Sequence, residues 1–198
     1  HAFFGDAEGG FSHRVLVDVP PTYGSTHFEM HDFDGDGRLD ILATHGDNGD
    51  YAPVLKPYHG VRIYLALPGE GRKITYEERV FFPLHGAFKA QAADYDGDGD
   101  LDIAAIAMFP DFDRPTEGFV FLEQTGTMTF RPYSFARASE GRWITMDSGD
   151  IDGDGDVDIV LGSFSSLRTG VPPALRQAWD ANPVNAMILE NRRFDSAR

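Results

Sequence analysis

The sequence predicts an all-β protein built from repeated antiparallel sheets, and three observations support this fold class. The 198 residues include 22 Gly and 12 Pro, which favour frequent turns over long helices. Short apolar or alternating segments recur with turn residues between them, as in a series of short strands. A motif rich in aspartate occurs three times, starting at Asp32, Asp94 and Asp150, and such spacing indicates repeated structural units.

The aspartate-rich motif defines the repeat. Each copy has nine residues, with Asp at the first, third, fifth and ninth positions and Gly at the fourth and sixth; the copies span 32–40, 94–102 and 150–158. Successive copies begin roughly 60 residues apart, which suits one four-stranded propeller blade with its loops and somewhat exceeds the common propeller repeats. We therefore predict a β-propeller of four-stranded blades, with about three blades in this chain.

Each repeat is expected to contribute its strands in the same order. The first strand precedes the aspartate motif, and the second follows it as a short apolar segment. The third is apolar or alternating, and in two repeats a Gly-containing turn leads from it to a fourth. The expected strands are 26–30, 41–44, 61–65 and 74–80 in the first repeat; 88–92, 103–107, 119–122 and 129–133 in the second; and 143–146, 159–161 and 187–189 in the third.

The chain is expected to begin and stop within a blade. Residues 2–11 match a third strand and turn, and 13–17 match a fourth strand. The expected segments are the end of a preceding blade, 1–25, and three repeats, 26–86, 87–141 and 142–198. Because about three blades cannot close a ring of roughly four to eight, the remaining blades are expected from the same polypeptide or from other chains.

One segment, 170–183, breaks the strand pattern. Pro172 and Pro173 open a run of good helix formers, and Pro is well tolerated in the first turn of a helix. A short helix is therefore expected at 173–181. Residues 46–60 and 109–118 occupy the equivalent position in their repeats and are expected to be long loops.

The motif has the composition of a calcium loop, because Ca²⁺ prefers six to eight hard oxygen ligands. Aspartates at positions one, three, five and nine supply carboxylates, position seven supplies its backbone carbonyl, and the glycines permit a tight turn with positive φ. The side chain at position seven is expected at the surface. The sequence predicts three Ca²⁺ sites, with ligands Asp32, Asp34, Asp36, Arg38 and Asp40; Asp94, Asp96, Asp98, Asp100 and Asp102; and Asp150, Asp152, Asp154, Asp156 and Asp158.

Two other interpretations of the motif are weaker. An EF-hand requires an acidic residue at position twelve and flanking helices, whereas position twelve is Ala43, Ala105 or Leu161 and the flanks resemble strands. Asp-Gly clusters can also be solvated turns without a metal. Three copies in one register favour the calcium interpretation over this one.

Together, the loops and the strand pattern resemble FG-GAP repeats, the integrin-α-type seven-bladed β-propeller, in the form found in many secreted bacterial proteins. The resemblance covers nearly the whole chain, although the Phe-Gly/Gly-Ala-Pro consensus that names the family is poorly kept. It implies Ca²⁺ in a hairpin loop between the first two strands of each blade, on one rim of the propeller. It also implies that this chain is part of a seven-bladed ring.

Composition excludes several classes of function. The net charge of −15 argues against nucleic acid or an anionic membrane as partner, because phosphate binding needs basic patches. The absence of Cys excludes thiolate metal sites and covalent haem. No apolar run reaches the length of a membrane span. Because weak Ca²⁺ sites suit compartments rich in calcium, an extracellular, periplasmic or cell-surface location in a bacterium is expected.

Two classes of function remain. The first is a non-catalytic binding or scaffold module, with a protein or glycan partner in a cell-surface or filamentous assembly. The alternative is a carbohydrate-active enzyme on the same fold, of the polysaccharide lyase or sugar dehydratase type, which would need basic and aromatic side chains to converge. The candidates for such a cluster are His31, His45, Lys56, Tyr58, His59 and Arg142.

Two smaller clusters leave alternatives open. His45, Asp47, Asn48 and Asp50 form either a further metal or substrate site or, as the favoured interpretation, a polar loop. Arg142 with Trp143 is either a platform for stacking sugars or, as the favoured interpretation, a site where a buried Trp packs between blades.

Overall fold

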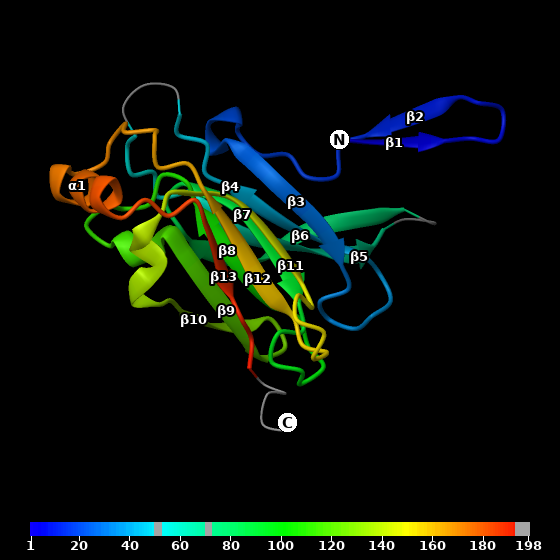
Figure 1. Ribbon diagram of the computed structural model, residues 1–198. Helices are drawn as coiled ribbons and strands as arrows, with labels where there is room; N and C mark the ends of the chain where they lie inside the picture. The colour runs from blue at the N-terminus through cyan, green and yellow to red at the C-terminus, as the bar shows by residue number, and fades with distance from the viewer. Residues whose placement is uncertain (50–52, 70–72, 193–198) are drawn as a thin grey trace.

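The protein is all-β in the computed structural model, with 45% of residues in strands and 11% in helices. The structure describes residues 1–49, 53–69 and 73–192. Several antiparallel sheets stack against one another (Figure 1), an arrangement consistent with a β-propeller-like fold. The predicted fold class is therefore confirmed at the level of all-β architecture and sheet pattern.

The first sheet contains four antiparallel strands in chain order. These are β3 (Ser25–His31), β4 (Asp40–His45), β5 (Gly60–Pro68) and β6 (Ile74–Pro83). The strand β5 is buried along most of its length, which explains why its sequence is apolar rather than alternating. Each strand contains the segment predicted for it and extends beyond it.

The second and third sheets repeat this order. The second sheet consists of β7 (Ala87–Ala93), β8 (Asp102–Ala107), β9 (Phe119–Gly126) and β10 (Thr129–Tyr133). The third sheet consists of β11 (Trp143–Gly149), β12 (Asp158–Ser163) and β13 (Ala186–Leu189). Within the described residues, the third sheet thus has three strands where the other two sheets have four.

The core lies in two layers between the stacked sheets. One layer joins the first and second sheets and includes Leu42 and Ile103; the other joins the second and third sheets and includes Ile106 and Trp143. Successive side chains of β8 enter opposite layers, because neighbouring residues of a strand point to opposite faces. Burial on both faces explains the continuous apolar sequence of this strand.

A separate hairpin precedes the first sheet. Its strands β1 (Ala2–Gly5) and β2 (Phe11–Arg14) pair with each other, and Figure 1 shows the hairpin projecting away from the three larger sheets. The predicted strand at 13–17 is shifted: β2 begins two residues earlier and ends at Arg14. The cause is the tight turn, in which Asp6 Oδ1 accepts hydrogen bonds from the amides of Glu8 and Gly10.

The helical elements occur in the connections. The only α-helix of the described residues, α1 (Pro173–Ala181), has the predicted bounds, and it buries Trp179, whose indole donates to Ser139 O at 2.8 Å. Three short 3₁₀ helices span Pro21–Tyr23, Pro115–Gly118 and Ala136–Glu140. No helix in the described residues is long and apolar enough to cross a membrane.

Strand pairing places two kinds of connection at opposite ends of the sheets. In the first sheet His31 pairs with Asp40 beside the aspartate loop, whereas Ser25 pairs with His45 at the far end. The long connections between the second and third strands of each sheet therefore lie opposite the aspartate loops; their described residues are 46–49 and 53–59, 108–118, and 164–185. The helix α1 marks this end in Figure 1.

Candidate metal centres

Each aspartate motif forms the hairpin loop between the first two strands of its sheet. The loops join β3 to β4, β7 to β8 and β11 to β12, as the sequence predicts. Glycine is required at positions four and six because both adopt positive φ, which side chains disfavour. The φ values are 74° and 85° at Gly35 and Gly37, 67° and 99° at Gly97 and Gly99, and 82° and 98° at Gly153 and Gly155.

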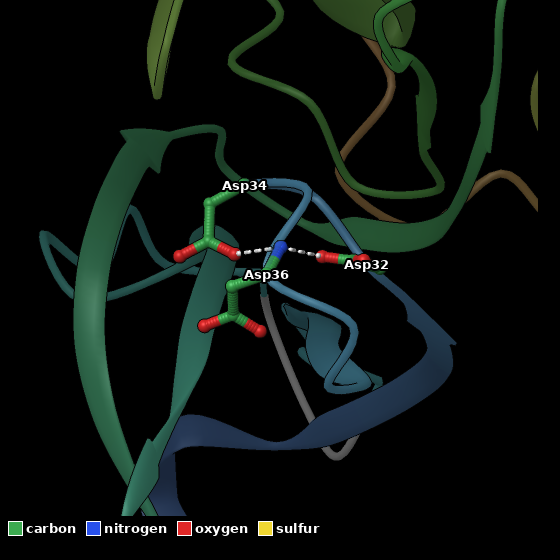
Figure 2. A group of neighbouring side chains, drawn as sticks. All are labelled: Asp32, Asp34 and Asp36. Carbon is green, nitrogen blue, oxygen red and sulfur yellow. Dashed lines mark hydrogen bonds between the residues drawn. The ribbon is translucent and has the colours of Figure 1, made fainter.

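In the first loop the carboxylates turn inward onto the loop backbone. Figure 2 shows the amide of Asp36 between the carboxylates of Asp32 and Asp34, at 3.0 and 3.2 Å. The amide of Gly37 donates to Asp32 at 2.8 Å. These bonds fix the carboxylates of Asp32 and Asp34, and one oxygen each of Asp32, Asp34 and Asp36 lies within 4.8 Å of the others.

The second and third loops share part of this backbone hydrogen bonding, although the carboxylates that gather there are those at positions one, three and nine. In each loop the carboxylate of the first aspartate accepts a hydrogen bond from the amide at position six. The three bonds are Gly37 to Asp32 at 2.8 Å, Gly99 to Asp94 at 3.1 Å and Gly155 to Asp150 at 3.2 Å. One backbone conformation therefore recurs in all three loops, and it depends on the shared aspartates and glycines.

The aspartate at position nine opens the second strand of each sheet and is fully buried. Asp40 accepts hydrogen bonds from the amide of Phe33 in its loop, at 2.9 Å, and from the amide of Ala66 in β5, at 2.8 Å. The same pair of bonds recurs at Asp102, from Tyr95 and Gln124, and at Asp158, from Ile151 and Asn191. The aspartate at position nine thus joins the loop to the third strand or to the segment directly after it.

Sequence reasoning did not find these amide donors. The motif does not contain them, and the distance along the chain from the aspartate to Ala66, Gln124 or Asn191 differs in each repeat. The available signal is that an aspartate opens an apolar strand, since a buried carboxylate requires donors.

The donor set suits a hard cation. The carboxylate oxygens of Asp94, Asp96 and Asp102 lie within 4.8 Å of one another, as do those of Asp150, Asp152 and Asp158. Asp94 Oδ1 and Asp154 Oδ2 are buried and have no hydrogen-bond partner among the described residues. Grouped carboxylates repel one another, and buried acceptors without donors are costly. A bound Ca²⁺ would relieve both costs, so these residues fit the ion.

Burial also shapes the electrostatics of the loops. Burial raises the pKa of Asp102 to about 6, although the amides of Gln124 and Tyr95 oppose this shift. The pKa of Asp40 is raised by the same cause. Without a cation, keeping all of these carboxylates ionised is therefore unfavourable.

Position seven corrects one expectation. Its side chain is not at the surface in every loop: Asp156 is buried, and Asp100 is half-buried. Arg38 is also half-buried, because its guanidinium pairs with Asp36 and its Nε donates to Ala66 O at 2.7 Å. The strand β5 beside the first loop provides the carbonyl that holds this arginine.

The candidates for an enzyme site do not all converge. His45 is buried at one end of β4, with Nδ1 3.0 Å from Ser25 Oγ. His31 lies at the opposite end of the same strand pair and contacts Glu29 at 3.1 Å. The buried Arg142 donates to the carbonyls of the long connections instead.

Part of the candidate set does gather around the end of β4. Tyr23 stacks on Tyr58 with 5.0 Å between ring centroids and meets His45 edge to face at 5.7 Å. His59 contacts Tyr58 edge to face at 5.4 Å and is buried, with its amide donating to the carbonyl of Lys56 at 3.1 Å. This is a packed aromatic and histidine cluster whose two imidazoles are closed to solvent.

The two smaller clusters agree with the interpretations favoured from the sequence, a buried Trp and a polar loop. Arg142 and Trp143 are both buried, so the sugar-stacking platform is wrong; the indole of Trp143 donates to Ala138 O at 2.7 Å. Asn48 is buried and its amide group donates to Val54 O at 2.7 Å, as in a polar loop. Asp50 lies outside the described residues. Among the described residues, the groups of side chains able to hold a metal are the three aspartate loops.

These features define a class of protein: an all-β repeat protein with stacked antiparallel sheets and an acidic hairpin loop in each repeat. Residues 94–161 match the model of the family described as FG-GAP-like repeat. The match runs from the first aspartate of the second loop into β12 and includes the whole third loop, and it supports the integrin-type repeat family for this segment. No curated protein matches the chain.

Proposed function

We propose that this chain is part of a calcium-binding β-propeller that acts as a non-catalytic binding module outside the cytosol of a bacterium. Its partner is a protein or a glycan within a cell-surface or filamentous assembly. The observation that carries the proposal is the recurrence of one loop conformation, with converging carboxylates, in three successive sheets. The FG-GAP-like repeat at 94–161 supports it, because such repeats are typical of propeller binding modules.

Each loop is proposed to hold one Ca²⁺. The carboxylates at positions one, three, five and nine and the carbonyl at position seven supply the ligands, so that Arg38, Asp100 and Asp156 contribute backbone oxygen. The ion is structural in this proposal. It holds the loop together. The aspartate at position nine extends this effect to the third strand or the segment after it, because its carboxylate accepts a backbone hydrogen bond from there.

The binding module is proposed to be a larger ring, the seven-bladed ring of the integrin-type family. The faces at the two ends of the sheet stack support this, because they expose large apolar side chains: Phe28 on the first sheet and Ile188 on the third. Exposed apolar patches mark surfaces that pack against a partner. The remaining blades come from the same polypeptide or from other chains.

The enzyme alternative receives less support. A lyase or dehydratase would require acid–base side chains within reach of one substrate. His31 and His45 lie at opposite ends of β3 and β4, and Arg142 has its donors directed at three backbone carbonyls. The aspartates of the loops are assigned to the metal.

Calcium titration tests the proposal. Isothermal titration of the protein stripped with EDTA is expected to give about three Ca²⁺ per chain, and each single change Asp32→Ala, Asp94→Ala or Asp150→Ala is expected to remove one. These residues occupy position one of their loops. The matched control, Asp113→Ala, changes an exposed aspartate outside the loops and is expected to leave the stoichiometry unchanged. Absence of calcium binding by the folded protein would refute the proposal.

A further inference from the structure

A cleft separates the helix α1 from the 3₁₀ helix Ala136–Glu140, which precedes β11. Figure 1 shows α1 at the end of the sheets opposite the aspartate loops. The cleft has a volume of about 510 Å³, which lies within the range of small-molecule sites. None of the residues that line it belongs to an aspartate loop, so the cleft is separate from the candidate metal centres.

Two tryptophans hold the 3₁₀ wall of the cleft in place. The indole of Trp143 donates to Ala138 O at 2.7 Å, and the indole of Trp179 in α1 donates to the next carbonyl, Ser139 O, at 2.8 Å. Trp143 and Ala138 are fully buried, and Trp179 is 3% exposed. Because buried hydrogen bonds fix one wall to the core and to the other wall, the cleft is preformed, as small-molecule sites usually are.

Aliphatic side chains supply the apolar part of the lining. Leu175 and Ala178 come from α1, and Pro183 and Val184 come from the segment that follows it. Leu175 and Val184 are half-buried, so their remaining surface is available to a ligand. These side chains offer contacts to the C–H groups of a ligand, whereas the ring of Trp179 is covered and offers no face for stacking.

Three polar side chains add donors and acceptors to the same lining. Arg137 and Glu140 form an ion pair at 2.9 Å, and Asn182 lies at the end of α1. A guanidinium only donates, a carboxylate only accepts, and a carboxamide does both. The charges of Arg137 and Glu140 cancel, so the lining is neutral in a chain whose net charge is −15.

Sugar hydroxyls match this set of groups. A hydroxyl both donates and accepts hydrogen bonds, so neighbouring hydroxyls of one ring can accept from Arg137 and donate to Glu140, while ring C–H groups contact Leu175. An anionic ligand would gain from the arginine but would be repelled by the carboxylate, and a cationic ligand would meet the reverse. The chemistry of the cleft therefore favours a neutral sugar over a uronate or an amine.

We propose that this cleft binds a neutral glycan. Hydrogen bonds to the charged groups of Arg137 and Glu140 are the strong kind, and the aliphatic lining contributes apolar contact. The inference rests on the proposed function, because it selects the glycan among the partners of the binding module. Because the cleft lies at the opposite end from the aspartate loops, glycan binding and calcium binding can be measured and can fail separately.

Tryptophan fluorescence tests the inference, because Trp179 lines the cleft and is one of two Trp in the chain. The calcium-loaded protein is titrated with neutral oligosaccharides of glucose, galactose, mannose and xylose, and with an oligogalacturonate as the acidic probe. At least one neutral oligosaccharide is expected to change the fluorescence along a saturable curve, and the oligogalacturonate is expected to bind more weakly. Binding of the oligogalacturonate alone would overturn the assignment to a neutral glycan.

Two arginine variants locate the binding. Arg137→Ala is expected to weaken the binding of that oligosaccharide roughly tenfold, the equivalent of one hydrogen bond to a charged group. The matched control is Arg114→Ala: Arg114 is also exposed and pairs with a glutamate three residues further on, Glu117, at 2.7 Å, but it does not line the cleft. This control is expected to keep the original affinity. An equal loss in both variants would contradict the proposed site.

A further pair of variants tests the cleft by filling it. Ala178 is exposed on α1 and lines the cleft, so Ala178→Phe is expected to abolish glycan binding. The control Gln177→Phe changes the neighbouring exposed residue, which does not line the cleft, and is expected to retain binding. Calcium titration of the same samples separates the two proposals. A protein that binds about three Ca²⁺ but none of the neutral oligosaccharides would overturn the glycan inference and leave a protein as the proposed partner.

Discussion

At the scale of single residues, the aspartate at position nine of each motif has two separable effects. Its carboxylate accepts two backbone hydrogen bonds inside the protein, and it is also a proposed Ca²⁺ ligand; Asp102 and Asp158 lie within the carboxylate groups of their loops. The aspartate at position three differs: Asp34 is exposed and accepts a hydrogen bond from the amide of Asp36 within its own loop. The two positions should therefore respond differently to substitution.

We expect Asp40→Asn to lower the free energy of unfolding by about 1–3 kcal/mol even in EDTA, because the side-chain amide replaces a buried acceptor with a donor. The control Asp34→Asn should have little effect in EDTA and should reduce stability only in Ca²⁺. Urea unfolding of both variants, with and without Ca²⁺, measures this difference. If Asp40→Asn matches the unchanged protein in EDTA, the two backbone bonds contribute no stability.

Two buried histidines predict a pH dependence. Burial, followed by the charges of Arg62 and His59, lowers the pKa of His45 to about 4; burial, followed by the charge of Lys56, lowers the pKa of His59 to about 4. An unfolded histidine has a pKa of about 6.5. The folded state thus binds fewer protons between these values, so stability is present above about pH 6.5 and falls as the pH drops toward 4.

We expect each of these histidines to lower the free energy of unfolding by up to about 3 kcal/mol as the pH falls through that range. The groups facing His45 include Arg62, His59, Ser25 and Tyr64, and burial raises the pKa of Tyr64 to about 12. None of these four supplies a compensating negative charge. Urea unfolding between pH 7 and pH 4.5 in saturating Ca²⁺ tests this. A His45→Gln variant with an undiminished pH dependence would show that the titrating groups lie elsewhere.

At the scale of elements, Arg142 holds together two of the long loops that join the second and third strands of the sheets. Its guanidinium donates to Met108 O at 2.8 Å, to Thr169 O at 3.1 Å and to Leu167 O, and it lies over the ring of Phe109 at 4.6 Å. These carbonyls belong to the segments after β8 and after β12. One side chain from the start of the third sheet therefore holds together loops that lack strand pairing of their own.

We expect Arg142→Ala to destabilise the protein by about 3 kcal/mol or more, because three carbonyls lose their donor in a buried site. The control Arg137→Ala removes an exposed ion pair with Glu140, and exposed ion pairs of this kind contribute little to stability. Denaturant unfolding compares the two variants. Equal effects would mean that water replaces the guanidinium at the three carbonyls.

The elements differ in how far the sequence predicts them. Strands such as β4, β8 and β12 follow an unmistakable loop and have apolar sequences, and α1 begins at two prolines, so periodicity and turn chemistry place them. The position of β2 depends on the register set by Asp6, which shifts the strand relative to its hydrophobic pattern. Arg142 and the amide donors to the ninth aspartates act across separate segments, and no local pattern predicts such contacts.

At the scale of the whole molecule, charge and metal binding are coupled. The chain has a net charge of −15 with 32 acidic residues, and the three loops concentrate many of these at one end of the sheets. Self-repulsion opposes the compact state. Three Ca²⁺ would carry six positive charges into that end, so the folded protein with calcium should be relieved of repulsion that the calcium-free protein retains.

This coupling gives a prediction that distinguishes bound calcium from general screening. In EDTA, raising NaCl from 10 mM to 0.5 M should raise the melting temperature, because salt screens repulsion between exposed carboxylates. In Ca²⁺ the melting temperature should already be several degrees higher and should depend less on salt. Mass action adds about 2.7 kcal/mol to the free energy of unfolding for a site when free Ca²⁺ is at a hundred times its Kd.

Equimolar Mg²⁺ should stabilise the protein much less than Ca²⁺, because Mg²⁺ demands a smaller octahedral site and dehydrates reluctantly. Differential scanning fluorimetry in EDTA, Ca²⁺ and Mg²⁺, each at low and high NaCl, measures these melting temperatures. Identical effects of Mg²⁺ and Ca²⁺ would mean that the loops act as a diffuse acidic surface rather than as three built sites.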